Sequence, residues 1–341
     1  VPYSPRYFYP GSTTEAGTGH RLFTYVHEWL PALTPGGGSH QFRDTPLALP
    51  EAWQAPQREL DLAEMLRFYR QPASYFLNRR LKVWFEELDA GLEEHEPFEL
   101  DGLQRYQLRH QLLTAQLAGQ SLPVIRERLQ LSGQLPQGAF GQLLLDEHDT
   151  EMRELAGRLR PYWQAQPQTC EIDLRLPEGR LLGWQVLHAG RQLVFKPNSL
   201  NGRDWLQAWI RHLCLCASDQ GDSLLVSPDE CWALLPVEAD TARRYLSALI
   251  QDWEAGMQRP LPFFPRTAWA WVGGLEKKGP DEARSKARSA FTGGFSVSGE
   301  GEDLYVRRCF PQLDDTALDA LGQLAERHLL PLLAHRESLE A

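Results

Sequence analysis

Cysteine is scarce in this sequence, and its cysteines do not have the spacing of metal sites or disulfide frameworks. The chain has 5 cysteines in 341 residues, an odd number, and no Cys-x-x-Cys pair. Scattered cysteines of this kind are typical of reduced thiols in a cytosol and argue against structural zinc. We therefore expect a cytoplasmic protein, and we interpret Cys214 and Cys216 as packing residues.

A secretory leader and long apolar runs are also missing. The chain begins at Val1 in the middle of a pattern, with no basic segment followed by an apolar run. No apolar stretch approaches the length needed to span a bilayer. We expect a piece of a longer protein with further domains upstream, and no membrane partner.

Several motifs that would indicate an enzyme class are absent. The sequence has no Gly-x-x-x-x-Gly-Lys-Ser/Thr, no Gly-x-Gly-x-x-Gly after a strand, no Gly-x-Ser-x-Gly and no His-Glu-x-x-His. These absences argue against a P-loop, a dinucleotide site, a serine hydrolase elbow and a zinc peptidase. The 10 histidines are scattered, so core or surface roles are expected for them, and no cofactor is predicted.

Positive charge is in the minority. The formal net charge is −10 at pH 7, which argues against a chain that wraps nucleic acid over its whole surface. Local basic patches remain compatible with this balance. The hydrophobic content of 42% is that of a folded globular chain, and 11 Trp with 24 Pro suit extended segments and docking loops.

The most informative stretch that is present is residues 171–217. Apolar and polar residues alternate over 171–176 and resume after a Pro-Glu-Gly turn over 181–187. A His-Ala-Gly turn then leads into a third extended run at 192–196. The pattern predicts an antiparallel meander of three strands.

A helix and two further strands follow the meander. An apolar stripe at helical spacing begins after Asp204, which is the expected N-cap, and strands are expected at 223–227 and 231–235. This order of strands and helices is that of the core of PD-(D/E)xK nucleases. The predicted fold class is therefore α/β (α+β), a mixed sheet flanked by helices.

The carboxylates of such a nuclease are missing. Its site needs an acid on one strand and an Asp or Glu two residues before a Lys on the next, to hold a magnesium ion and orient water. The alignment places Val186 and Val194 at the acid positions and keeps Lys196. Glu171 and Asp173 are nearby, but alternation puts them on the polar face of the first strand. We predict a nuclease-like core that has lost its catalytic acids and binds no metal.

The rest of the chain divides around this core. Residues 1–56 are rich in Pro and Gly and predict an extended arm, and 57–341 predict one nuclease-like domain. Within it, 57–166 is expected to be helical, 167–260 to be the strand-helix core, and 261–341 a basic and aromatic loop with closing helices. Helices are expected at 61–69, 72–81, 98–120, 121–130, 142–163, 239–257 (capped by Asp240), 281–291 and 316–333, with an extended connector at 260–265.

Basic residues lie next to aromatic residues in two regions, one near residue 80 and one over 266–310. Aromatic rings could stack on bases while cations hold phosphates. The alternative interpretation is an ordinary solvated helix face in the first region, and in the second a mobile loop with a helix that closes the edge of the core. The candidate DNA-binding residues are Arg79, Arg80, Lys82, Trp269, Trp271, Lys277, Lys278, Arg284, Lys286, Arg288, Arg307 and Arg308.

Several motifs in one order carry a resemblance to a known family. They lie at residues 2–8, 68–81, 98–106, 135–141 (Leu-Pro-x-Gly-Ala-Phe-Gly), 209–213 (Trp-Ile-x-His-Leu) and 299–303 (Gly-Glu-Gly-x-Asp). Together they resemble the C-terminal region of the RecC family, the gamma chains of the bacterial exodeoxyribonuclease V (RecBCD) helicase-nuclease. The resemblance covers essentially the whole chain.

The resemblance implies a subunit that docks RecB and RecD, helps to split a forked or duplex-end DNA and acts in double-strand break repair and homologous recombination. It implies that ATP and Mg²⁺ are used by partner subunits and that the nuclease-like domain itself is not an enzyme. The strand-separating wedge is expected in loops of residues 260–275 or in the hairpins of 176–195. A purely structural docking module and an active metal-dependent nuclease remain as alternatives.

Overall fold

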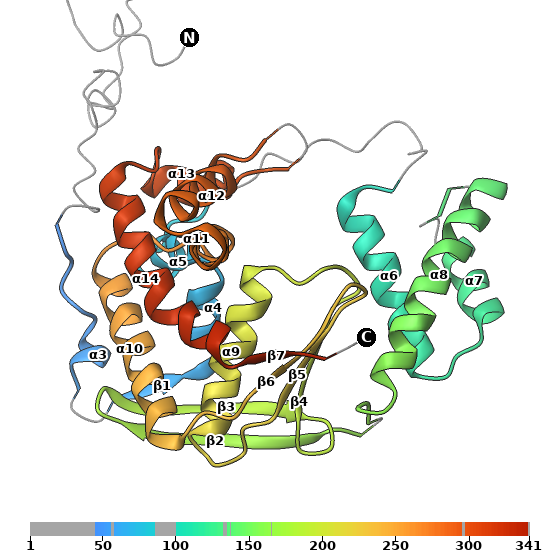
Figure 1. The fold of residues 1–341 in the computed structure, drawn as a ribbon, viewed down its shortest axis with the longest axis horizontal. Helices are drawn as coiled ribbons and strands as arrows, with labels where there is room; N and C mark the ends of the chain where they lie inside the picture. The colour runs from blue at the N-terminus through green and yellow to red at the C-terminus, as the bar shows by residue number, and fades with distance from the viewer. Residues whose placement is uncertain are drawn as a thin grey trace, which may run out of the picture. The chain divides into compact units, whose positions relative to one another are not determined.

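The computed structural model describes residues 45–55, 58–85, 100–131, 135–136, 138–164, 166–294 and 297–339 (Figure 1). Two sheets of mixed direction are flanked by helices, so the predicted α/β class is confirmed. Most of the predicted arm lies outside the described residues. Its last part carries a short helix, α3 (Glu51–Gln54).

The first sheet is built on a long hairpin. Strands β2 (Gln168–Leu176) and β3 (Gly179–Leu187) pair antiparallel along their whole length, as the alternation predicts. A third strand, β1 (Glu59–Asp61), joins β3 in parallel and gives the order β1-β3-β2. Ile172 and Leu181 are fully buried on the inner face, since side chains along a strand alternate between its two faces.

The second sheet corrects the predicted meander. Strand β4 (Gln192–Phe195) does not pair along β3; it lies parallel to β5 (Ser223–Val226) in a separate sheet. Strands β6 (Cys231–Leu234) and β7 (Arg336–Ser338) complete the order β4-β5-β6-β7. All four residues of β5 are buried. Its backbone groups find hydrogen-bond partners because β5 pairs with β4 on one side and with β6 on the other. A local pattern cannot reveal that parallel pairing.

Three helices cover the strands and build the main core. They are α4 (Leu62–Arg70), α9 (Gly202–Cys216) and α10 (Ala239–Gln258). Trp205 and Trp209 of α9 are almost completely buried. The apolar stripes predicted for 61–69, 204–215 and 239–257 are therefore the packed faces, as expected for amphipathic helices.

Two predicted helix caps are wrong by a few residues. The N-cap of α9 is Asn201, whose side chain accepts from the backbone N–H groups of Arg203 and Asp204. Asp204 is instead the third residue of a reciprocal capping box. Helix α10 is capped by the Glu238 side chain, not by Asp240. In both cases an acceptor two or three residues earlier in the sequence satisfies the free N–H groups.

The other helices lie beside these three helices or to one side, next to the second sheet (Figure 1). They are α5 (Pro72–Tyr75), η3 (Phe76–Arg80), α6 (Gly102–Leu117), α7 (Leu122–Leu131), α8 (Ala139–Leu159), α11 (Pro265–Lys278), α12 (Pro280–Thr292), η4 (Glu300–Glu302), α13 (Leu304–Cys309) and α14 (Asp315–Ala334). The predictions at 281–291 and 316–333 correspond to α12 and α14. Residues 86–99, where a predicted helix began, lie outside the described residues.

Helices α6, α7 and α8 share an apolar core with the second sheet. Leu112, Met152 and Leu155 belong to one buried cluster with Leu224 and Val226 of β5. These helices therefore pack directly on the strand core, and residues 45–341 form one unit. No helix of the described ranges is long and apolar enough to cross a membrane.

Candidate nucleic-acid interface

Of the two candidate tryptophans, Trp271 is buried and Trp269 is half-buried, and both lie on a helix. Residues 265–278 form α11, so the predicted aromatic loop at 260–275 is wrong over most of its length. Trp271 is only 6% exposed, and its Nε1 donates to Glu326 at 3.0 Å. Trp269 stacks on Trp205 at 5.2 Å between ring centroids. Pro265 in the first turn of the helix favours its start.

The cations predicted on α12 have acidic partners. Arg284 pairs with Asp319 of α14, and Arg288 pairs with Asp315 at 2.5 Å. Lys286 lies 3.7 Å from Glu282 one turn earlier. Exposed pairs of this kind contribute little to stability, but they neutralise the face that carries them. Lys277 and Lys278 are exposed in the last turn of α11.

The basic residues near position 80 have different roles in the structure. The Arg80 guanidinium donates to the backbone carbonyls of Met257 and Ala48. Arg80 therefore links two segments of the chain. Arg79 pairs with Glu64 at 3.2 Å and lines a cavity. Lys82 is exposed, as are Arg307 and Arg308 on α13. These last three residues do not line the cavities described below.

The hairpin of 176–195, the other expected wedge, is tied down at its turn. The carbonyl oxygen of Glu178 accepts from Arg58, and the Glu178 carboxylate accepts from Gln251 of α10 at 2.8 Å. At the opposite end, His188 stacks on Trp163 at 4.6 Å. Neither turn of the hairpin is free of contacts with the body.

The structure separates the positions expected to be relics of a nuclease site. Val194 and Lys196 line one cavity, whereas Val186 points outward from β3 and is 56% exposed. The Lys196 Nζ lies 2.9 Å from Asp204 Oδ1 and 5.9 Å from the centre of the Tyr106 ring. Lys196 is therefore engaged by a carboxylate of α9 and is not poised to orient a water.

The acids on the first strand have the surface role that alternation predicts. Asp173 accepts two hydrogen bonds from Arg180, at 2.7 and 2.6 Å, and this contact holds the pKa of Asp173 below its ordinary value. Glu171 is exposed on the same strand. Within the described ranges, His, Cys, Asp and Glu do not gather in groups of three or more that could hold a metal ion.

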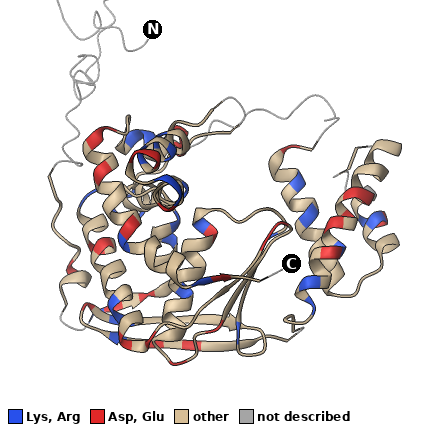
Figure 2. Ribbon diagram, viewed as in Figure 1, with Lys and Arg blue, Asp and Glu red and all other residues tan. Residues whose placement is uncertain are grey.

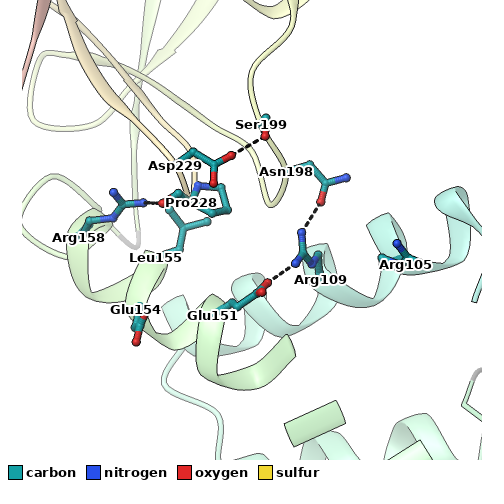
Figure 3. Close-up of a pocket in the computed structure, with 10 residues that line it drawn as sticks. All are labelled: Arg105, Arg109, Glu151, Glu154, Leu155, Arg158, Asn198, Ser199, Pro228 and Asp229. Atoms are coloured by element: carbon teal, nitrogen blue, oxygen red, sulfur yellow. Dashed lines mark hydrogen bonds and ion pairs between the residues drawn. The ribbon is translucent and has the colours of Figure 1, made fainter. Parts of the chain in front are cut away.

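Helices α6 and α8 form one wall of a cavity of about 690 Å³ that lies against the loops before α9 and β6 (Figure 3). Arg109 of α6 reaches across it, donating to Asn198 Oδ1 at 3.0 Å and pairing with Glu151 of α8. Arg158 donates to the carbonyl oxygens of Ser227 and Pro228. The donors of these two arginines are used to fasten helices to loops.

Acids also balance the cations of this first cavity. Glu151, Glu154 and Asp229 are among its lining residues, and Asp229 accepts a hydrogen bond from Ser199 at 2.5 Å. Three arginines therefore face three carboxylates. A cavity without a charge excess gives no preference for an anion.

Two other cavities adjoin each other and are strongly basic. Their volumes are about 480 and 370 Å³, and they share Arg70 and Arg203. We call them together the basic trough. Its cations are Arg67 and Arg70 of α4, Arg79 of η3, Lys196 after β4, and Arg203 and Arg211 of α9; its other lining residues are Gln71, Ser74, Tyr75, Asn78, Trp84, Val194, Asn201, Asp204, Gln207 and Ala208. Asp204 is the one carboxylate among these residues, so the trough carries an excess of positive charge.

The trough could not be recognised from local charge. Basic and acidic residues are mixed along most helices (Figure 2), so a basic residue has to be judged by its partners. Of the predicted binding residues, only Arg79 lines the trough, and Lys196, which the sequence placed at an expected nuclease-like position, lines it too. Arg70, Arg203 and Arg211 were missed because α4 and α9 lie far apart in the sequence. The helical spacing of Arg67 and Arg70 was the one available signal.

Comparison with known proteins gives a consistent family. The profile of the RecC C-terminal domain matches residues 57–276. The RecBCD enzyme subunit RecC of Escherichia coli (strain K12) is 32% identical over 354 aligned residues, which cover 99% of this chain and 30% of that protein. The RecC subunits of Buchnera aphidicola subsp. Schizaphis graminum and Mycobacterium tuberculosis (strain H37Rv) are 22% and 23% identical, over 82% and 83% of this chain. The chain spans less than a third of the length of these relatives.

Proposed function

The chain belongs to the RecC C-terminal domain family, and from this premise we propose that it is the non-catalytic C-terminal domain of a RecC subunit. In this role it contacts a strand of forked or duplex-end DNA and docks RecB and RecD in a cytoplasmic complex for DNA repair and recombination. ATP and Mg²⁺ are used by the partner subunits. The proposed fold is a nuclease-like core whose acids have been replaced.

The observation that carries the proposal is the chemistry at the junction of β4 and α9. A nuclease would need a carboxylate at Val194 to bind a hard cation. Instead an apolar side chain lies there, the neighbouring Lys196 is paired with Asp204, and Arg70, Arg203 and Arg211 line the same cavity. Such a site repels a metal ion and attracts a phosphate group.

The element order supports the nuclease-like origin. Strands β2, β3 and β4 are followed by α9, then by β5, β6 and α10. The crossover through α9 makes β4 and β5 parallel neighbours, and the connection of parallel strands through a helix is the ordinary solution. The helix thus brings its own polar N-terminal turn against the end of β4.

The proposal is tested by incubating the purified chain with a labelled forked duplex and Mg²⁺ over a salt series. We expect a complex that weakens steeply with salt, because phosphate contacts release counterions, and DNA strands that stay intact. The Lys196→Ala variant is the control for chemistry. Cleavage by the wild-type chain that is lost in Lys196→Ala would overturn the non-catalytic assignment.

A second candidate is a docking module that does not touch DNA. The observation in its favour is the outer face of β3, where Trp184 and Val186 are 67% and 56% exposed. Exposed apolar side chains that adjoin on one strand face offer apolar area to a protein partner. We expect Trp184→Ser to weaken assembly with RecB or RecD without changing DNA binding. Negligible DNA binding by the wild-type chain, together with normal assembly, would favour this candidate over the first.

A further inference from the structure

The basic trough contains two guanidinium groups that no acid of the described ranges neutralises. Arg70 and Arg211 have neither an ion pair nor a side-chain hydrogen bond there, whereas Lys196 and Arg203 have Asp204 and Glu300. Arg211 is only partly exposed, and burial lowers the pKa of its guanidinium from its ordinary value. A poorly solvated cation without a counter-charge gains more from an anion than a solvated one does.

Buried polar atoms in the trough also lack partners. Arg203 Nε and Gln71 Nε2 are buried donors without an acceptor, and Asn78 Oδ1 is a buried acceptor without a donor. All three residues line the trough. Buried polar groups without partners are uncommon, because each costs the free energy of its lost hydration. Two donors and one acceptor correspond to what a phosphate oxygen and a base edge would satisfy.

An aromatic ring lies at the same place. Trp84 lines the larger cavity, 61% exposed, beside Arg79 and Arg70. Large exposed indoles are rare in the described part of the chain, since most tryptophans there are built into the core or stacked on other rings. A wall with an exposed ring among cations is the usual design of single-strand binding grooves, where bases stack and phosphates meet arginine.

The cavity of Figure 3 is less suited to an anion than the basic trough is. There Arg109 and Arg158 are bonded to carbonyl, amide and carboxylate oxygens, and three acids line the walls. An anion entering that cavity would have to displace existing bonds. In the trough an anion would find Arg70 and Arg211 unengaged.

We propose that the basic trough binds the phosphodiester backbone of a single DNA strand, with Arg70 and Arg211 on phosphates and Trp84 stacked on a base. The inference rests on the proposed function and deepens it by assigning the strand contact to α4, η3 and α9. A single strand fits better than a duplex because duplex bases are already stacked on one another and do not present a face to Trp84.

The test compares two double variants that remove the same charge. Arg70→Gln with Arg211→Gln changes the trough, and Lys277→Gln with Lys278→Gln changes two rival candidates from the sequence, which are exposed at the end of α11 and do not line the trough. The probe is a fluorescein-labelled oligodeoxythymidylate, and its affinity is measured by anisotropy in low salt. We expect affinity about tenfold or more weaker for the trough variant and less than twofold weaker for the α11 variant.

The role of Trp84 is tested with two substitutions. Trp84→Ala removes the ring and is expected to weaken the oligonucleotide about fivefold or more, while Trp84→Phe retains much of the affinity, because stacking depends on an aromatic face. Photo-crosslinking of a 4-thiothymidine oligonucleotide to the wild-type chain provides a measurement without mutation. The crosslinked peptide is expected to contain Trp84 or a neighbouring residue of the trough.

The outcomes separate the two proposals. If the wild-type chain binds no strand, the proposed DNA contact fails and the trough assignment fails with it. If the wild type binds while the trough variant matches the α11 variant, or the crosslinks lie elsewhere, only the trough assignment is overturned. Competition by inorganic phosphate at constant ionic strength that equals competition by the unlabelled oligonucleotide would show a free-phosphate site and overturn the strand assignment. Thermal unfolding of each variant identifies a loss that comes from misfolding, and the crosslink then decides.

Discussion

At the scale of single residues, the buried polar groups show which side chains serve the fold. His212 of α9 is completely enclosed, with Nδ1 2.9 Å from Ser223 Oγ and Nε2 3.0 Å from the Leu235 carbonyl oxygen. A carbonyl oxygen can only accept, so we assign the hydrogen to Nε2, and Nδ1 faces the Ser223 oxygen, whose hydroxyl donates to Gln192 Oε1 at 3.1 Å. The ring is thus held neutral, and burial lowers its pKa to about 4.

This residue predicts a pH dependence of stability. Between the ordinary pKa of 6.5 and the folded value of about 4, the unfolded chain binds the proton more readily than the folded chain. The contribution of His212 is therefore complete above pH 6.5 and is lost as the pH falls toward 4. The loss is on the order of 3 kcal/mol at most.

The measurement is the free energy of unfolding in urea at pH 7, 5.5 and 4.5 for the wild type and His212→Gln. The variant is expected to be less stable at pH 7 but to lose less on acidification. His148 and His188, whose pKa values burial also lowers, remain in both chains and act in the same direction. Parallel pH profiles for the two chains would contradict the assignment.

At the scale of elements, close approach of helices depends on glycine at particular positions. A Cβ at Gly256 of α10 would lie 2.4 Å from Cζ of Phe68 on α4, a fully buried ring. A Cβ at Gly273 of α11 would have nothing within 4 Å. The two glycines look equivalent in sequence because both interrupt an amphipathic helix.

Substitution by alanine should change the stability in opposite directions at these two glycines. Gly256→Ala is expected to destabilise the chain by about 1 to 3 kcal/mol through overpacking against Phe68. Gly273→Ala is expected to stabilise it by about 0.5 to 1 kcal/mol, because alanine favours a helix interior over glycine. Denaturant midpoints of both variants check this pair of opposite signs. A stabilising Gly256→Ala would show that α4 and α10 are not packed as closely as described.

At the scale of the whole molecule, the net charge of −10 makes any DNA contact local. A negatively charged chain gains nothing from long-range attraction to DNA, so its affinity depends on the few phosphates that meet cations without an acidic partner. The basic trough provides such cations, while the α12 cations are balanced by Glu282, Asp315 and Asp319.

The salt dependence of binding measures how many phosphates are met. For single strands the logarithm of the affinity falls with the logarithm of salt concentration by about 0.7 per contact. Removing Arg70 and Arg211 together should therefore reduce the slope by about 1.4, and removing Lys277 and Lys278 should leave it unchanged. An unchanged slope in the trough variant would mean that its two arginines do not contact phosphate.

Local pattern determined much of this protein. The strands β2, β3, β5 and β6 and the helices α10, α12 and α14 lie where the spacing of their apolar residues predicts them. The surface role of Asp173 also follows from residue type and spacing alone.

Only the tertiary structure decided which residues meet. It paired β4 in parallel with β5, buried the side chain of Trp271 on α11, and brought Arg70 of α4 to the same cavity as Arg211 of α9. These outcomes depend on contacts between residues about 30 to 140 positions apart, whose free energy comes from burial and pairing and leaves no periodic trace in the chain. Charge in the sequence therefore identified basic residues, and the fold determined which of them lack a partner.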